Sequence, residues 1–177
     1  MSASSTGRPS DELPPLLDRA DLRRALGAFP TGVTIVTTLA EDGTLQGLTA
    51  NAFTAVSLDP PLVLVCIGHR SRSYQSFIRS GRFAIHILSD AQAEAARHFA
   101  RPGTVRGAAV PWSLNERGLP VLDHYVALIE CRLSAEHRGG DHAILVGAVE
   151  AISHGPQDAR PLLYHRGQLL GPQALAG

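Results

Sequence analysis

The chain has 177 residues, 44% of them hydrophobic, which gives about 78 apolar side chains and predicts a single domain with one sizeable core. Its 16 Lys and Arg residues balance 16 Asp and Glu residues, so the formal net charge is zero. Because nucleic acid and acidic membranes attract an excess of positive charge, we expect neither as a partner. Every basic residue is Arg, which excludes lysine Schiff-base chemistry and leaves Arg, hydroxyls and backbone N–H groups to bind anions.

The composition along the chain indicates one folded domain with a tail at each end. Residues 1–17 contain Ser, Pro and charged residues without the apolar stretch of a signal peptide, and they predict a disordered tail. We expect a domain over 18–170 and a second tail over 171–177. Apolar runs are too short to span a membrane, and the isolated Cys66 and Cys131 favour buried thiols, so we expect a cytoplasmic protein. The spacing of the Cys and His residues predicts no metal site.

A helix begins the predicted domain, and strands then dominate. In Asp18–Phe29, apolar residues recur at helical spacing and predict an amphipathic helix with a buried face. The predicted strands are Gly32–Leu39, Thr44–Phe53, Leu62–Ile67, Arg82–Leu88, one or two short strands in Trp112–Leu122, Tyr125–His137, His142–His154 and Pro161–Leu169. Two further helices are expected over Ser71–Arg79 and Asp90–Ala100, and a loop over Arg101–Val110. Many strands without strict β-α-β alternation predict an antiparallel barrel with peripheral helices.

Three segments carry more polar chemistry than a simple barrel requires. Thr49–Leu62 begins as a strand but holds hydroxyls, an amide and an Asp-Pro-Pro turn; it is either a ligand-facing segment or an ordinary edge strand. Gly68–Ser73 offers two hydroxyls and two Arg residues as a phosphate seat, or it is a solvated helix start. In Gly139–His142, Asp141 could orient the His142 imidazole toward a ligand, or the segment is a plain hairpin turn.

Taken together, these segments resemble the flavin reductase-like family of short-chain NAD(P)H:flavin oxidoreductases. The resemblance rests on Thr31–Thr38, Thr49–Phe53, the Ser57–Ile67 stretch, the later Gly-Asp-His and Pro161–Gly167. It implies a mainly β fold, an FMN-binding split β-barrel of antiparallel, Greek-key type with a few peripheral helices. It also implies a homodimer, two flavin sites near the subunit interface, and a partner flavin-dependent monooxygenase that receives diffusible reduced flavin.

The resemblance also implies the residues of the site. It puts the flavin ring against Thr49–Asn51 and the Ser57–Leu58 backbone, the flavin phosphate on the Arg70–Ser73 loop, and His142 beside the nicotinamide as the catalytic residue. The implied cofactor-binding residues are Thr34, Thr49, Ala50, Asn51, Ser57, Leu58, Cys66, Ile67, Arg70, Ser71, Ser73, Phe99, Ala100, Asp141, His142 and Tyr164. Many relatives have Ser where this chain has Ala52, so a hydroxyl contact to the flavin is missing here.

The predicted function is therefore hydride transfer from NADH, or NADPH, to FMN or FAD, with reduced flavin released to the monooxygenase. Cofactors carry that chemistry, which agrees with the absence of an obvious catalytic pair in the sequence. Two alternatives remain open at this point. One is a reductase with tightly bound flavin and another electron acceptor, and the other is a non-catalytic flavin- or haem-binding protein.

Overall fold

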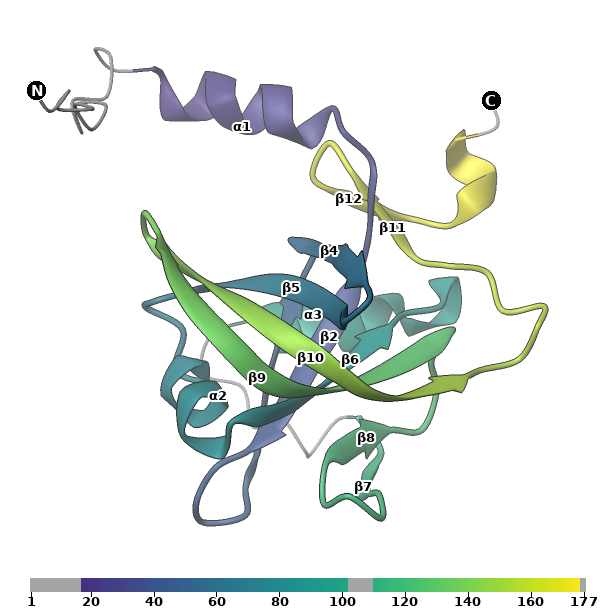
Figure 1. Cartoon of the computed structure of the whole chain (residues 1–177). Coiled ribbons are helices and arrows are strands. Elements are labelled where there is room, and N and C mark those ends of the chain that lie inside the picture. The colour runs from purple at the N-terminus through teal and green to yellow at the C-terminus, as the bar shows by residue number, and fades with distance from the viewer. Residues whose placement is uncertain (1–16, 102–109, 176–177) are drawn as a thin grey trace, which may run out of the picture.

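A seven-stranded antiparallel sheet forms the body of the molecule in a computed structural model that describes residues 17–101 and 110–175 (Figure 1). The strands of this sheet are β2 (Thr34–Leu39), β3 (Leu45–Ala50), β4 (Phe53–Leu58), β5 (Pro61–Gly68), β6 (Arg82–Ile87), β9 (Ala127–Gly139) and β10 (His142–His154). The expectation of a mainly β, antiparallel fold is confirmed. Most of the predicted strands are found, with ends shifted by a few residues where Tyr125–His137 becomes β9, but the predicted strand Thr44–Phe53 ends at Ala50 and the separate strand β4 was not predicted.

The order of the strands requires the sheet to curl. It runs β3-β2-β6-β9-β10-β5-β4, so β3 and β4 lie at opposite edges. These two strands are nevertheless consecutive in the chain, and only Asn51 and Ala52 separate them. Three peptide units join Ala50 to Phe53 and span at most about 11 Å, so the two edges must meet. The sheet is thus closed at one end, and the residues at this seam belong to both edges.

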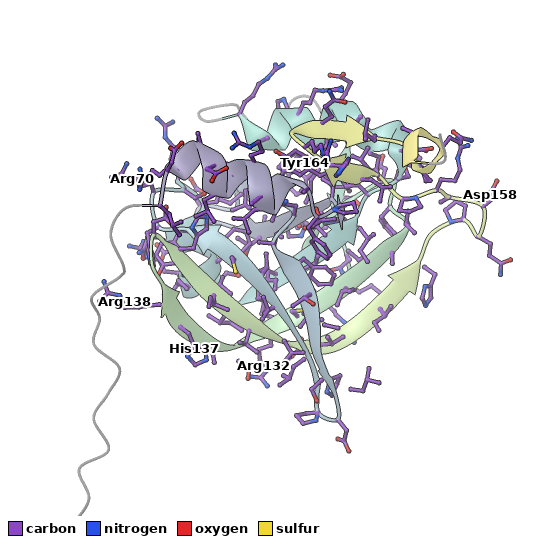
Figure 2. The ribbon with its side chains drawn as sticks, turned by 90° about the horizontal axis from the view of Figure 1, so that it is seen from above. Arg70, Arg132, His137, Arg138, Asp158 and Tyr164 are labelled. Atoms are coloured by element: carbon purple, nitrogen blue, oxygen red, sulfur yellow. The ribbon has the colours of Figure 1, made fainter. Side chains whose placement is uncertain are left out.

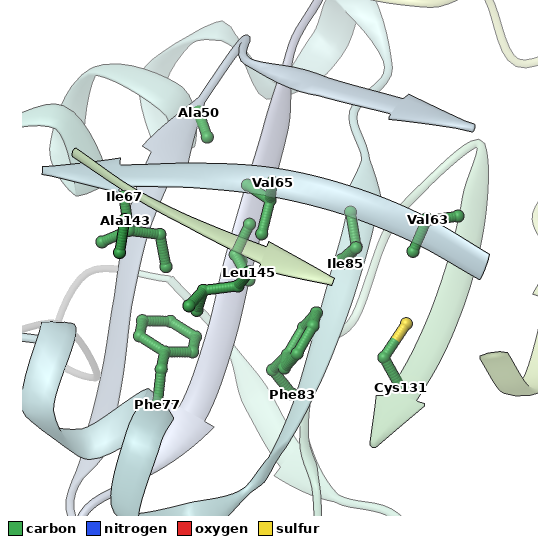
Figure 3. Packing of buried hydrophobic residues seen from close by; sticks show 11 residues of the cluster. Ala50, Val63, Val65, Ile67, Phe77, Phe83, Ile85, Cys131, Ala143 and Leu145 are labelled. Carbon is green, nitrogen blue, oxygen red and sulfur yellow. The ribbon is translucent and has the colours of Figure 1, made fainter. Parts of the chain in front are cut away.

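Phenylalanines and branched aliphatic residues fill the barrel interior (Figure 3). Phe77 and Phe83 lie with ring centroids 6.2 Å apart in an edge-on arrangement and are fully buried. A second cluster packs β2 against a helix and the C-terminal segment, through Ile35, Phe99 and Leu162. Each of these large side chains removes its apolar surface from water, which contributes roughly 1.5–3 kcal/mol per residue.

The two later helices cover the sheet. Helix α2 spans Tyr74–Ser80 rather than the expected Ser71–Arg79, because the preceding residues form turns. The expected helix over Asp90–Ala100 is divided into a 3-10 turn, Asp90–Gln92, and helix α3, Ala93–Ala100. Ser89 starts this segment with a reciprocal capping box to Gln92.

Helix α1 departs from the prediction in its burial. It forms as expected over Arg19–Gly27, with Asp18 capping it through the Ala20 N–H, yet none of its residues is buried. Leu26 is 66% exposed and Phe29, just past the helix, is 74% exposed. The expectation of a buried apolar face is therefore wrong within one chain, because α1 projects over the end of the barrel instead of packing on it (Figure 1).

The C-terminal segment is a hairpin where one strand over Pro161–Leu169 was expected. Its strands are β11 (Leu163–His165) and β12 (Gln168–Leu170), and β11 also pairs with β1 (Thr31–Gly32). The reversal occurs at Arg166 and Gly167, whose φ angles are 49° and 84°. Both residues thus have the left-handed backbone of a tight hairpin turn. The turn was not predicted from the sequence because Arg is unusual at its first position.

The remaining predictions concern short elements and the termini. Trp112–Leu122 forms two short strands, β7 (Trp112–Leu114) and β8 (Pro120–Leu122). Both cysteines are free thiols; Cys131 is buried, as expected, whereas Cys66 is only half-buried. The predicted tail over 1–17 and the predicted loop over 101–110 fall almost wholly outside the described residues, whereas Pro172–Leu175 of the predicted C-terminal tail forms a 3-10 turn. Within the described ranges, no helix has the length and apolar character needed to cross a membrane.

A buried histidine joins the barrel to the β7–β8 hairpin. His86 on β6 is fully buried; its Nδ1 donates to the Ile35 carbonyl at 3.0 Å, and its Nε2 accepts from the Leu122 N–H at 3.1 Å. Burial lowers the pKa of His86 to about 4, against an ordinary value of 6.5. A proton added to Nε2 would also face the Leu122 N–H, so the fold requires the neutral ring.

The His86 environment predicts acid destabilisation. Between pH 6.5 and about 4 the unfolded chain holds a proton that the folded chain does not. The contribution of neutral His86 to the free energy of unfolding should therefore be fully present above pH 6.5. It should fall by up to about 1.4 kcal/mol per pH unit as the pH is lowered toward about 4. Urea unfolding at several pH values measures this slope, and imidazole ¹⁵N chemical shifts report the tautomer. A His86 that titrates near pH 6.5 in the folded protein would contradict the prediction.

Candidate functional site

A pocket of about 380 Å³ lies at the seam between β3 and β4. Three segments distant in the sequence build it: the seam itself, the loop after β5, and the turn that begins β10. The end of α3 closes a further side. The lining residues are Leu48, Thr49, Ala50, Asn51, Ala52, Cys66, Gly68, Arg70, Ser71, Arg72, Phe99, Ala100 and His142.

Hydrogen bonds from inside the protein fix the seam. The buried Thr34 hydroxyl donates to the Ala50 carbonyl at 2.7 Å, and the Thr49 hydroxyl donates to the Ala96 carbonyl on α3 at 2.6 Å. From β5, the strand next to the opposite edge, the Cys66 N–H donates to the Ala52 carbonyl at 3.0 Å. The backbone from Thr49 to Ala52 is therefore held from three directions, which presents it as a rigid wall to a ligand.

The loop after β5 supplies the positive charge of the pocket. The side chains of Arg70, Ser71 and Arg72 line it, and the Ser71 N–H donates to the Gly68 carbonyl at 2.8 Å, which tightens the loop. The His69 N–H donates to the Asp141 carbonyl at 3.0 Å. Two guanidinium groups and a hydroxyl on one wall suit an anionic group such as a phosphate.

Ser73 lies differently from the rest of this loop. It is 2% exposed, and its hydroxyl donates inward to the Gly47 carbonyl at 3.1 Å. Gly47 packs tightly against Phe99, because a Cβ added there would lie 2.8 Å from Cε1 of Phe99. Ser73 thus anchors the start of α2 to β3, and the structure does not place its hydroxyl on the pocket.

His142 and Asp141 form an ordered pair at the pocket edge. Nδ1 of His142 donates to Oδ1 of Asp141 at 2.7 Å, and the bond and charge of His142 lower the pKa of the Asp141 carboxyl. Nε2 faces Gly68, since a Cβ added at this glycine would lie 3.6 Å from that atom. Gly68 thus leaves space beside the imidazole, and the carboxylate sets which nitrogen faces the pocket.

A second hollow, of about 670 Å³, adjoins the first one and shares Thr49, Asn51 and Ala100 with it. Its far wall is the β11–β12 hairpin, and it contains Tyr164, which the sequence analysis assigned to the site. Figure 2 shows Arg70 and Tyr164 toward the two ends of α1, which crosses above the barrel. The described residues provide no cluster of three His, Cys, Asp or Glu side chains for a metal ion.

Comparison with known proteins identifies the family of this chain. The family described as "Flavin reductase like domain" matches residues 26–171, which is most of the chain. The chain belongs to the flavin reductase-like family. The structure of the Streptomyces globisporus C-1027 NADH:FAD oxidoreductase SgcE6, in complex with NAD and FAD fragments, superimposes with a TM-score of 0.81 at 39% identity, over 89% of this chain and 95% of that one. The expected split barrel is confirmed by this likeness.

Several curated relatives are reductases of two-component systems. The chain is 38% identical to the flavin-dependent monooxygenase reductase subunit HsaB of Mycobacterium tuberculosis, over 88% of this chain and 83% of that protein. It is 42% identical to the reductase component of a flavin-dependent trigonelline monooxygenase from Acinetobacter baylyi, over 86% of this chain. The chain spans about half of that protein (48%), and about half (51%) of a Rhizobium meliloti relative that is 44% identical.

Most residues that the family resemblance implies do line the pocket. The pocket contains Thr49, Ala50, Asn51, Cys66, Arg70, Ser71, Phe99, Ala100 and His142 from that set. Four others have different surroundings. Ile67 points into the core and is fully buried, Thr34 supports Ala50 from behind, and Ser57 and Leu58 lie at the far end of β4, opposite Leu62 and Pro61.

Several residues of the two hollows were not predicted from the sequence, because their role depends on shape rather than chemistry. Gly68 was quoted only as the start of a loop, yet it lies beside the His142 ring, where an added Cβ would be 3.6 Å from Nε2. Arg97, Gln168 and Leu169 line the adjoining hollow. The signal that could have found the last two is the pair Arg166-Gly167, if it had been recognised as a hairpin turn.

Two threonines of β2 offer a matched test of the seam. Thr34→Val removes the hydroxyl that holds the Ala50 carbonyl, and Thr37→Val removes an equally buried hydroxyl that donates to the Pro120 carbonyl at 2.6 Å. Each change removes one buried hydrogen bond and should cost roughly 0.5–1.5 kcal/mol in urea unfolding. Only Thr34→Val should weaken flavin binding in a fluorescence titration. Equal flavin affinities in the two variants would contradict a positioning role of Thr34.

Proposed function

We propose that this chain is an NADH-dependent flavin reductase that supplies reduced flavin to a partner monooxygenase. The observation that carries the proposal is the meeting, in one pocket, of a fixed backbone wall, a basic loop and the Asp141-oriented His142. The backbone wall suits a planar ring, the basic loop suits a phosphate, and the oriented imidazole suits a nicotinamide. The relatives described above have names that specify flavin, NADH, or a monooxygenase partner.

The flavin ring would lie along Thr49–Ala52, with its phosphate toward Arg70, Ser71 and Arg72. The volume of the pocket is in the range typical of small-molecule sites, and Phe99 adds apolar surface beside polar backbone. This assignment keeps Ser71 from the predicted phosphate site and omits Ser73, because the Ser73 hydroxyl already donates to the Gly47 carbonyl. The fit applies equally to FMN and to FAD, whose flavin and first phosphate are identical.

His142 would hold the nicotinamide against the flavin. Its Nε2 faces the pocket beside Gly68, and in the neutral ring that donates through Nδ1, Nε2 accepts a hydrogen bond. The carboxamide NH₂ of a nicotinamide is a suitable donor to it. The His69 N–H bond to the Asp141 carbonyl joins this turn to the phosphate loop, so the two cofactor positions are fixed relative to one another.

The chemistry that flavin and nicotinamide supply, when both are bound, is hydride transfer between their rings. The protein has to bring the two rings together, which is a positioning effect and needs no proton-transfer pair. The backbone from Thr49 to Ala52 provides the flat support, the Arg70–Arg72 loop anchors one end, and His142 orients the second ring. These are the tasks that we assign to this chain.

Release of the reduced flavin agrees with the small number of strong contacts that the pocket offers to a flavin. Ala52 lines it with a methyl group, which offers no hydroxyl contact to a flavin. Of the residues proposed to hold the phosphate, Arg70 is exposed to solvent, and a solvent-exposed ion pair contributes only about 0–1 kcal/mol. A site of this kind can exchange flavin with a monooxygenase, whereas a permanent prosthetic group needs more buried contacts.

We further propose that two copies of this chain associate through β4 and α1. β4 is an edge strand with Val56 and Leu58 projecting apolar side chains into solvent, and Leu58 is 93% exposed. Leu22 on α1 adds a further exposed apolar group. Covering such a surface with a second copy removes it from water and satisfies the unpaired edge. Ser57 and Leu58, which the family resemblance places near flavin, could then approach the pocket of the partner.

The function is tested by mixing the purified protein with NADH or NADPH and with FMN or FAD. We expect flavin-dependent loss of absorbance at about 340 nm, fastest with NADH. His142→Ala should raise KM for NADH about tenfold, the value of a lost hydrogen bond to an ordered ring, and leave the flavin Kd unchanged. His137→Ala, an exposed histidine of β9, is the control and should have no effect. Flavin binding without NADH oxidation would instead support a non-catalytic flavin protein.

The dimer is tested by placing a charge on β4. Leu58→Glu should shift the protein from dimer to monomer in light scattering coupled to size-exclusion chromatography, because a carboxylate cannot be desolvated without a partner. Leu114→Glu changes a 55% exposed leucine on β7 and should leave the dimer intact. A wild-type monomer, or a dimer that both variants retain, would contradict this interface.

A further inference from the structure

The β9–β10 hairpin carries His142 at the end of an arm, residues 134–142, that extends past the barrel (Figure 1). β6 pairs with β9 only as far as Arg132. Beyond that pairing, the outer edge of β9 has no strand partner in the described part of the chain. The other side of the arm is paired, because β10 runs beside β5 until His142 lies opposite Gly68. Strand pairing therefore holds the arm along one edge only.

A β-bulge lies at the base of the arm. Ser134 is an extra residue on β9, because its neighbours Leu133 and Ala135 pair with consecutive residues of β10. A bulge interrupts the ladder of hydrogen bonds and bends the strand that contains it. Beyond the bulge, residues 136–142 are all exposed, so core packing does not fix the direction of the arm.

A side-chain hydrogen bond crosses from the body of the protein to the unpaired edge of the arm. The Tyr74 hydroxyl, at the start of α2, donates to Oε1 of Glu136, two residues past the bulge. The Tyr74 ring packs against the barrel core, and the adjacent Ser73 is anchored to the Gly47 carbonyl, so the donor belongs to a fixed element. The bond to Glu136 raises the pKa of Tyr74, so the hydroxyl keeps the proton that it donates.

The same tyrosine is connected to His142 from the side of the phosphate loop. The His69 imidazole lies edge-on to the Tyr74 ring, with ring centroids 5.2 Å apart. The His69 N–H donates to the Asp141 carbonyl, and the Asp141 carboxylate accepts from Nδ1 of His142. Tyr74 thus contacts the arm along β9 through Glu136 and reaches its end through His69.

We propose that Tyr74 and Glu136 are positioning residues, which hold the arm so that His142 faces the nicotinamide. The proposal rests on the reductase function, because that function places a nicotinamide beside His142. Neither Tyr74 nor Glu136 lines the flavin pocket, so their effect on the reaction passes through the arm. Their bond raises the fraction of molecules in which His142 is aligned, and the apparent affinity for NADH rises with that fraction.

Removal of the tyrosine hydroxyl tests this role. Tyr74→Phe keeps the ring against the core and His69 but deletes the donor to Glu136. We expect KM for NADH to rise about 3- to 10-fold, while kcat and the flavin Kd change by less than about twofold. Glu136→Leu should have the same effect. Glu136→Gln, whose amide oxygen still accepts the bond, should retain most of the NADH affinity.

A double-mutant cycle separates positioning from general destabilisation. Because the bond acts through His142, Tyr74→Phe should add nothing to the KM for NADH of His142→Ala, whereas a structural defect would add its own effect in both backgrounds. Glu41→Leu is the matched control. Glu41 pairs with Arg79 at 3.7 Å and connects the same helix, α2, to the turn between β2 and β3, so its loss should leave KM for NADH unaltered.

Hydrogen exchange reports on the arm without any catalytic assay. The backbone amides of residues 137–142 should exchange faster in Tyr74→Phe and in Glu136→Leu than in the wild type, because the bond that restrains their edge is lost. The amides of β2 and β6, which lie in the body of the sheet, should exchange at the wild-type rate.

The possible results separate the proposal from the reductase function. If the wild type oxidises NADH, an unchanged KM in Tyr74→Phe, or an equal rise in the His142→Ala background, would overturn the positioning role alone. A Glu136→Gln variant as impaired as Glu136→Leu would overturn it as well. A wild type that oxidises no NADH would contradict the reductase function; equal exchange of residues 137–142 in that protein and in Tyr74→Phe would then show that the bond does not hold the arm either.

Discussion

The two-residue link at Asn51 and Ala52 is the constraint on which the rest of the molecule depends. It joins strands from opposite edges of a seven-stranded sheet, so the sheet must close, and it closes at this link. Where the edges meet, the regular pairing is interrupted, and the backbone of the seam becomes accessible to a ligand. The property that makes the fold a barrel therefore also creates the pocket that we propose as the binding site.

Polar side chains in the protein interior hold the backbone in place where the strand pairing is interrupted. The hydroxyls of Thr34, Thr49 and Ser73 all donate to carbonyls around the pocket instead of to a ligand. Each of these buried bonds contributes roughly 0.5–1.5 kcal/mol. The same bonds give the pocket a fixed shape before a ligand arrives, which reduces the ordering that binding requires.

The sequence was sufficient for the fold class and for the segments of the site, but not for the direction of each side chain. Strand periodicity located β10 to the residue, and the Gly68–Ser73 and Gly139–His142 segments do meet. Ser73 was misplaced because its sequence does not say whether a hydroxyl faces outward or toward Gly47. The apolar stripe of α1 predicted a helix correctly, yet a stripe cannot specify whether its own chain, a ligand or a second copy covers it. The β11–β12 hairpin was not predicted because Arg166 is an unfavourable residue for a turn position with positive φ.

The site contains no buried acid or base, whereas the fold buries several titratable groups elsewhere. His86, Glu130 and Cys131 are buried on β6 and β9, and burial, with the charges of Glu150 and Glu130, raises the pKa of the Cys131 thiol to about 12. None of the three lines the pocket. Enzymes that move protons place perturbed groups at the reacting atoms. A protein that only aligns two rings needs none there, so a flat wall, an anchoring loop and an oriented imidazole suffice. Changes that move the wall should therefore affect activity more than changes that alter charge.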